Sequence, residues 1–116
     1  MVRRMPNQSE HLTQVFSALA DPTRRAVLAR LSEGPCPTTA LLRPFKMALP
    51  SFAQHLDVLE RSGLVCSRKA GRVRTYELAP QRLEVAEHWL TTRRREWQTR
   101  LNQLDSYLDT LKKERS

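Results

Sequence analysis

The sequence has little glycine, little cysteine and few aromatic residues. Its 116 residues include three glycines, two cysteines, three phenylalanines, two tryptophans and two tyrosines. The glycines, Gly34, Gly63 and Gly71, each stand where a helix or strand is expected to end, so none belongs to a phosphate-cradling loop. An enzyme needs such a loop, an activated nucleophile or paired carboxylates. We therefore do not expect catalysis from this chain, and we expect no cofactor.

Long apolar runs are also absent, because the uninterrupted apolar stretches are only a few residues long. A transmembrane helix needs about 20 such residues, so we expect no contact with a membrane. Residues 1–8, MVRRMPNQ, are basic, but the apolar stretch of a secretory signal does not follow them. We expect a cytoplasmic protein whose residues 1–8 form a disordered arm.

Acidic residues are in the minority. The chain has 20 Lys and Arg residues against 12 Asp and Glu residues, a formal net charge of +8 and a pI near 10.5. Such a balance favours a polyanionic partner. Double-stranded DNA is the partner that the remaining features favour.

Apolar residues at helical spacing predict two helices in the first third of the chain, from Ser9 to about Ala20 and from Pro22 to Ser32. Asp21 is placed to cap the second of these helices. Two shorter helices follow, over residues 38–43 with Thr38 or Thr39 as the cap, and over residues 49–62. The connection Pro44–Met47 makes this pair a helix-turn-helix candidate.

The outer face of the predicted helix 49–62 carries the side chains that we expect to contact DNA. Gln54 can pair with adenine, and Ser51 and His55 can bond base edges or phosphates. Leu49 and Pro50 stand near the helix start, where they could touch a thymine methyl group.

A basic hairpin follows the helix-turn-helix candidate. Residues 64–69 and 73–78 are rich in strand formers and flank the turn Ala70-Gly71-Arg72. The hairpin carries four cations that could neutralise phosphates, namely Arg68, Lys69, Arg72 and Arg74. Helices followed by a basic hairpin are typical of a winged helix-turn-helix domain.

A long helix is predicted from Pro80 to Lys113, with a bend near Thr91-Thr92. Apolar residues recur along it at steps of seven, and its second half has a nearly complete apolar seam. We expect this helix and the first helix to form a homodimer through Leu12, Phe16, Leu90, Trp97, Leu101, Leu104 and Leu108. The predicted fold is mainly α with a small β-hairpin, a winged helix-turn-helix domain over residues 9–113 that ends in a long C-terminal dimerisation helix.

Three segments resemble the ArsR family of bacterial winged-helix repressors: FSALADPTRRAVLARLSEGP, MALPSFAQHLDVLERSGLV and GRVRTYEL. The C-terminal segment AEHWLTTRRREWQTRLNQLDSYL is similar to the metal-independent branch of that family. The resemblance implies a homodimeric repressor that reads an inverted repeat with residues 49–62 and occludes a promoter. Ala48 and Leu49 depart from the Ser and Gln that many members carry there.

The sequence offers few residues that could form a sensor site for a metal or a small molecule. Thr38–Leu42 contains no thiol, and the long helix offers only His88 near Glu84 and Glu87, so no metal site is expected. A redox switch through Cys36 and Cys66 stays open as an alternative. A second alternative is a protein-interaction adaptor without strong DNA affinity, and the sequence does not identify an inducer.

Overall fold

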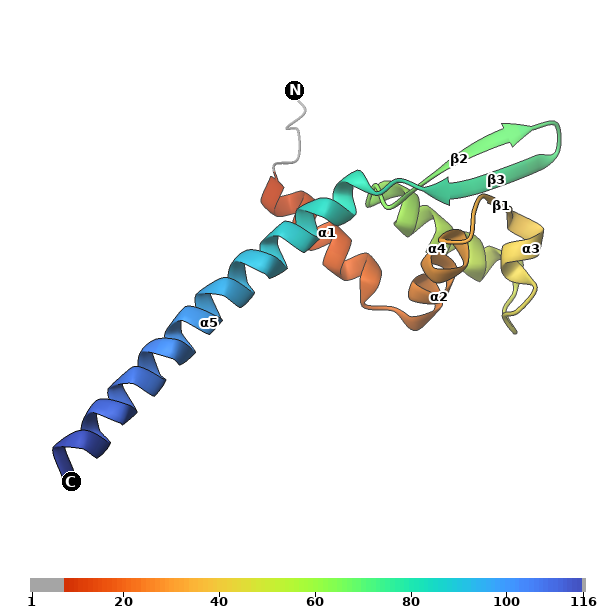
Figure 1. The fold of residues 1–116 in the computed structure, drawn as a ribbon. Coiled ribbons are helices and arrows are strands. Elements are labelled where there is room, and N and C mark those ends of the chain that lie inside the picture. Colours follow the sequence, from red (N-terminus) through yellow and green to blue (C-terminus); the bar gives the residue numbers. More distant parts are fainter. Residues whose placement is uncertain (1–7, 116) are drawn as a thin grey trace. The chain divides into compact units, whose positions relative to one another are not determined.

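The computed structural model describes residues 8–115 (Figure 1). Its internal contacts divide the chain after Ala86. Residues 8–86 contain four complete helices, a three-stranded sheet and the start of a fifth helix. Residues 87–115 are helical throughout. The predicted N-terminal arm lies outside the described residues apart from Gln8, which begins the first helix.

Helices α1 (Gln8–Leu19) and α2 (Pro22–Leu31) agree with their predicted ranges to within one residue at each end. Asp21 caps α2 as expected, because its backbone is extended and its Oδ2 accepts a hydrogen bond from the Arg24 amide at 2.9 Å. This bond holds the pKa of Asp21 below its ordinary value. Pro22 stands at the start of the helix, where its missing N–H costs nothing.

Helices α3 (Thr38–Leu42) and α4 (Leu49–Arg61) form the predicted helix-turn-helix pair. The expectation that Thr38 or Thr39 caps α3 is wrong: the cap position belongs to Pro37, and the Thr38 hydroxyl donates instead to the Arg74 carbonyl at 3.1 Å. Ala48 precedes α4 without a side-chain cap. In the connection, the Phe45 ring lies 5.3 Å from the Phe52 ring between centroids and fixes the turn against α4.

The hairpin strands are β2 (Val65–Ala70) and β3 (Val73–Leu78), which pair antiparallel around Gly71 and Arg72. Gly71 has a φ of 62°, a backbone conformation that glycine adopts without strain in a two-residue hairpin turn. The sequence prediction missed a third strand, β1 (Cys36–Pro37), which pairs with β3 and gives the order β1-β3-β2. A two-residue strand that ends in proline lacks the length and the alternation that would predict it.

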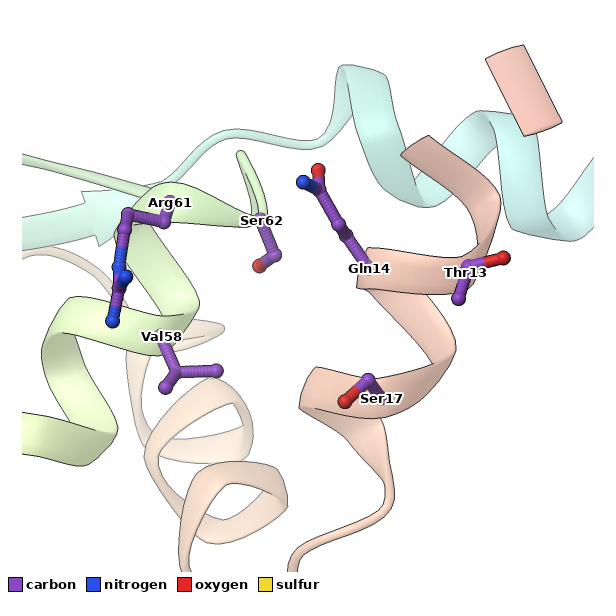
Figure 2. A pocket seen from close by; sticks show the side chains of 6 residues that line it. All are labelled: Thr13, Gln14, Ser17, Val58, Arg61 and Ser62. Carbon is purple, nitrogen blue, oxygen red and sulfur yellow. The ribbon is translucent and has the colours of Figure 1, made fainter. Parts of the chain in front are cut away.

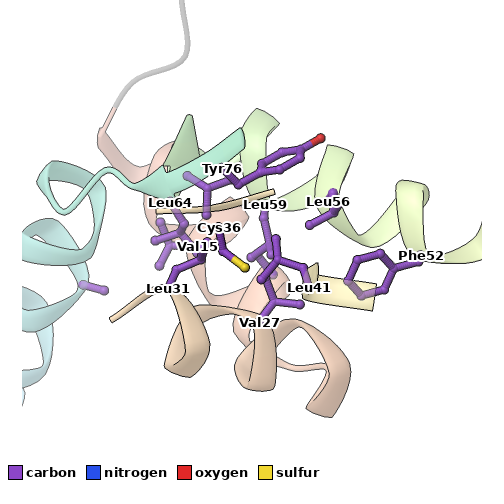
Figure 3. Packing of buried hydrophobic residues seen from close by; sticks show 13 residues of the cluster. Val15, Val27, Leu31, Cys36, Leu41, Phe52, Leu56, Leu59, Leu64 and Tyr76 are labelled. Carbon is purple, nitrogen blue, oxygen red and sulfur yellow. The ribbon is translucent and has the colours of Figure 1, made fainter. Parts of the chain in front are cut away.

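The hydrophobic core of the part that ends at Ala86, called the winged part below, packs against the inner face of α4 (Figure 3). Phe52, Leu56 and Leu59 are spaced three and four residues apart and are almost completely buried. They pack with buried residues from the other helices and from the sheet, namely Val15, Ala18, Val27, Leu31, Cys36, Leu41, Leu64, Val65, Tyr76 and Ala86. The inner face of α4 is thus fixed by burial, which leaves its outer face to solvent.

Helix α5 (Gln81–Arg115) runs without a break, so the bend expected at Thr91-Thr92 has no counterpart in the secondary structure. The Thr92 hydroxyl donates to the His88 carbonyl at 3.0 Å, a local bond compatible with a continuous helix. Beyond Ala86 most apolar side chains of α5 are exposed. Within residues 8–115, no helix is both long enough and apolar enough to cross a bilayer. The predicted fold class is confirmed.

We predict that Asp21→Ala lowers the free energy of unfolding by about 1 kcal/mol at neutral pH, because the first turn of α2 loses its cap. Asp21→Asn keeps an acceptor at that position and is expected to stay near the wild type. Because the pKa of Asp21 is lowered on folding, its ionised carboxylate adds stability above pH 3.8 that is lost as the pH falls further. Urea denaturation measures this, and an unchanged midpoint for Asp21→Ala would contradict the cap.

Candidate nucleic-acid interface

The outer face of α4 presents the predicted contact residues on one side of the helix. Ser51 and Gln54 are exposed, and Leu49 and Pro50 are exposed at the helix start. The apolar face of the same helix is buried in the core. The predicted contact residues therefore stay at the surface. A helix with one buried face and one free polar face is suited to enter the major groove of DNA.

His55 lies on the same helix, but it is half-buried and held by the protein itself. Its Nδ1 lies 3.1 Å from Nη1 of Arg24 and 3.7 Å from Oδ2 of Asp21. Arg24 and Asp21 belong to α2 and its cap, 31 and 34 residues earlier in the chain. The sequence prediction missed this cluster, since no local pattern brings α2 next to α4.

Arg24 is the centre of this cluster. Its Nε donates to the Ala18 carbonyl at 2.8 Å, and its Nη2 donates to the Ser17 carbonyl at 3.0 Å. These carbonyls lie in the last turn of α1, where backbone acceptors have no partner within the helix. One guanidinium group therefore ties the end of α1 and the start of α2 to the outer side of α4.

The hairpin of β2 and β3, called the wing below, carries the four predicted cations. All of them are exposed: Arg68, Lys69, Arg72 and Arg74. Lys69 stands directly opposite Arg74 in the strand register, so their side chains lie on the same face of the hairpin. Like charges at directly opposed positions destabilise a hairpin. An anionic partner such as a phosphate backbone would offset that repulsion.

The root of the wing is fastened to the helix-turn-helix pair by a chain of polar contacts. Arg74 donates through Nη1 to the Ser67 hydroxyl at 2.8 Å, and Ser67 donates to Oε2 of Glu60 at 2.8 Å. The Arg74 carbonyl also accepts the bond from Thr38. Arg74 is thus partly engaged in orienting the wing, whereas Arg72 stands in the turn at its tip.

A hollow of about 330 Å³ lies between α1 and α4 (Figure 2). Gln14 and Ser17 from α1 face Val58 from α4 and Ser62, which directly follows α4, across it. The remaining lining residues are Thr13 and Arg61, and Arg61 also forms an ion pair with Asp57 at 2.7 Å. The lining has hydroxyls, an amide and a guanidinium but no carboxylate or imidazole, so it lacks a general base.

The two cysteines do not form a switch pair within one chain. Cys36 on β1 and Cys66 on β2 flank β3 on opposite sides, which separates their backbones by about twice the 4.8 Å strand spacing. A disulfide needs Cα atoms within about 7 Å. Desolvation and the neighbouring Glu77 carboxylate also raise the pKa of the Cys66 thiol, which disfavours the reactive thiolate.

The part of the chain that the structure describes contains no cluster of metal-ligating side chains. No group of three or more His, Cys, Asp or Glu side chains there is arranged to hold an ion. His88, Glu84 and Glu87, the only candidates noted in the sequence, do not form such a group.

Two helices joined by a tight turn and followed by a basic hairpin define a winged helix-turn-helix protein. In agreement, the family model of a helix-turn-helix domain matches residues 19–68. The chain is 45% identical over 67 residues to the HTH-type transcriptional regulator Rv2034 of Mycobacterium tuberculosis, covering 58% of this chain and 63% of that protein. It is 28% identical over 79 residues to the transcriptional repressor SdpR of Bacillus subtilis, covering 68% and 88% respectively.

The crystal structure of an ArsR family transcriptional regulator, RHA00566, superposes with a TM-score of 0.76 at 47% identity. That match covers 81% of this chain and 97% of the other. The chain belongs to the ArsR family of transcriptional regulators.

We predict that Arg72→Ala weakens binding to all DNA sequences alike and lowers the slope of log affinity against log salt by about 1, because one phosphate contact is lost. Arg30→Ala is the matched control, since it removes the same charge from an exposed position on α2 that pairs with Glu33. Fluorescence anisotropy at several salt concentrations measures both variants. An unchanged slope for Arg72→Ala would remove the wing tip from the interface.

Proposed function

We propose that this chain is a homodimeric transcriptional repressor that binds double-stranded DNA at an inverted repeat and occludes a promoter. The observation that carries the proposal is the pairing of a free polar face on α4 with an exposed, self-repelling basic hairpin beside it. The first surface suits a major groove and the second suits the flanking phosphates. The relatives Rv2034 and SdpR, named as a regulator and a repressor, support the same function.

Sequence readout is assigned to the first two turns of α4. Gln54 is exposed and can accept from and donate to an adenine edge at once. Ser51 lies three residues before it on the same face, and Leu49, with 53% of its surface exposed, offers an apolar contact to a thymine methyl group. The contacts of the wing add affinity without distinguishing bases.

The dimer is assigned to the apolar side chains of α5. In the single chain, side chains of the predicted seam are about half or more exposed at Leu90, Trp97, Leu101 and Leu104. A second copy of the chain would cover such a heptad stripe. Leu12 and Phe16, assigned to the same interface from the sequence, are partly buried against the core of the winged part. Their share in the dimer is therefore expected to be smaller.

The experiment that tests the function is selection of bound sequences from a random DNA pool by the purified protein, at two salt concentrations. We expect enrichment of an inverted repeat, because a two-fold dimer presents two copies of α4. Affinity should fall steeply with salt. Failure to enrich any sequence, with salt-insensitive binding to a protein partner, would favour the adaptor function instead.

A second selection with Gln54→Ala tests the assignment of base readout. We expect the preference to relax at one base pair of each half-site, at a cost of about 1–3 kcal/mol for the original base. Arg30→Ala, on the exposed surface of α2, is the control and is expected to leave the enriched motif unchanged. An identical enriched motif for Gln54→Ala would exclude Gln54 from readout.

We predict that Leu104→Glu shifts the chain from dimer toward monomer, because a carboxylate in an apolar seam would be desolvated without a partner. Gln103→Glu is the matched control: it adds the same charge at the neighbouring residue, which is not one of the seam residues and lines a surface hollow with Arg100. Sedimentation equilibrium measures the mass of both variants. A Leu104→Glu protein that remains as dimeric as the control would contradict the interface.

A further inference from the structure

The contact between Arg24 and His55 fixes which imidazole nitrogen carries the proton. Nη1 of Arg24 lies 3.1 Å from Nδ1 of His55 in hydrogen-bonding geometry. A guanidinium has only donors and stays charged in proteins. Nδ1 must therefore accept, which leaves the proton of the neutral ring on Nε2. The Asp21 carboxylate is 3.7 Å from Nδ1, beyond hydrogen-bond distance, so it does not compete for a proton there.

The other nitrogen of His55 is open to solvent. Nε2 of His55 has no hydrogen-bond partner among the described residues. If it were also buried, it would be a buried polar atom without a partner, but in the described residues Nη1 of Arg82 is the one such atom. Nε2 is therefore accessible to water. His55 follows Gln54 directly and lies one helical turn after Ser51. His55 therefore belongs to the same side of α4 as the predicted base contacts.

We propose that Arg24 is a positioning residue for DNA binding: it holds His55 in the Nε2–H tautomer, so that His55 donates to a phosphate oxygen of the DNA backbone. The proposal rests on the proposed function and adds a residue of α2 to the interface. A phosphate fits better than a base edge, because His55 is tied back against α2 and is only 23% exposed. The side chains of Ser51 and Gln54 are exposed and are not held by α2, so they are better placed for base edges.

The tautomer decides the sign of this contact. With the proton on Nδ1, Nε2 would present a lone pair to the anionic phosphate and would repel it. With the proton on Nε2, the ring makes a charge-assisted hydrogen bond. The bonds of Arg24 to the Ser17 and Ala18 carbonyls hold its guanidinium in place, so the correct tautomer exists before DNA arrives. Asp21 and Arg24 are the charged groups that face the ring, and neither moves the proton to Nδ1.

The first test is nitrogen-15 NMR of the imidazoles in the full chain without DNA, in mildly alkaline buffer. We expect the His55 signals of a protonated Nε2 and a bare Nδ1. Arg24→Gln should give a mixture of tautomers. Arg25→Gln is the matched control, because Arg25 also binds a carbonyl at the end of α1, that of Leu19 at 2.7 Å, and is absent from the His55 cluster. A protonated Nδ1 in the wild type would overturn the proposal.

The second test is affinity for the selected operator and for unrelated DNA. His55→Ala should weaken both by about 10-fold, the loss expected for a hydrogen bond to a charged group. His55→Gln, whose amide nitrogen can take the place of Nε2, should recover most of that loss. Arg24→Gln should weaken both DNAs in the same way, and Arg25→Gln should not. Equal affinity for His55→Ala and the wild type would overturn the proposal.

The outcomes separate this proposal from the proposed function. If the wild-type protein selects no DNA, the repressor function fails, and the NMR experiment still decides the tautomer. If the wild type binds its operator but His55→Ala binds equally well, the repressor function stands and the role of His55 and Arg24 fails. Thermal melting of each variant shows whether a loss of affinity comes from unfolding, and His55→Gln with Arg24 intact tests the donor in a folded protein.

Discussion

The burial of one face of α4 is the constraint on which the rest of the winged part depends. Phe52, Leu56 and Leu59 are almost completely inaccessible to solvent, and residues from every other helix and from the sheet pack around them. Because a helix is rigid, fixing its inner face also fixes the direction of its outer face. The placement of Ser51 and Gln54 in solvent is therefore a consequence of core packing, which also holds the proposed DNA-contacting face in its direction.

Polar contacts then connect this helix to its neighbours at two places. Arg24 ties the end of α1 to His55, and the chain from Arg74 through Ser67 to Glu60 ties the wing to the far end of α4. Both use side chains that resemble plain surface charges when the sequence is read alone. They hold α4 and the hairpin in one arrangement, so that under the proposed function less order would have to be gained when DNA binds.

Two surface features are unfavourable in the isolated chain: like charges on the wing and an exposed apolar stripe on α5. Lys69 and Arg74 repel each other across the wing, and the apolar stripe of α5 stays exposed in a single chain. Each feature is unfavourable alone and becomes favourable when the complementary surface, a phosphate backbone or a second copy, covers it. The proposed partners, DNA and a second copy of the chain, would cover these same features.

The sequence by itself determined the four short helices, the hairpin, the long helix and the polar face of α4, because hydrophobic periodicity, the Asp21 cap and the Gly71 turn are local signals. The resemblance of three segments also determined the family. Only the tertiary structure decided the pairing of β1 with β3, the use of Thr38 on the wing instead of as a cap, and the Arg24 contact with His55. These contacts join residues 31 to 40 positions apart, and such pairings depend on how the elements pack together, which local periodicity does not encode.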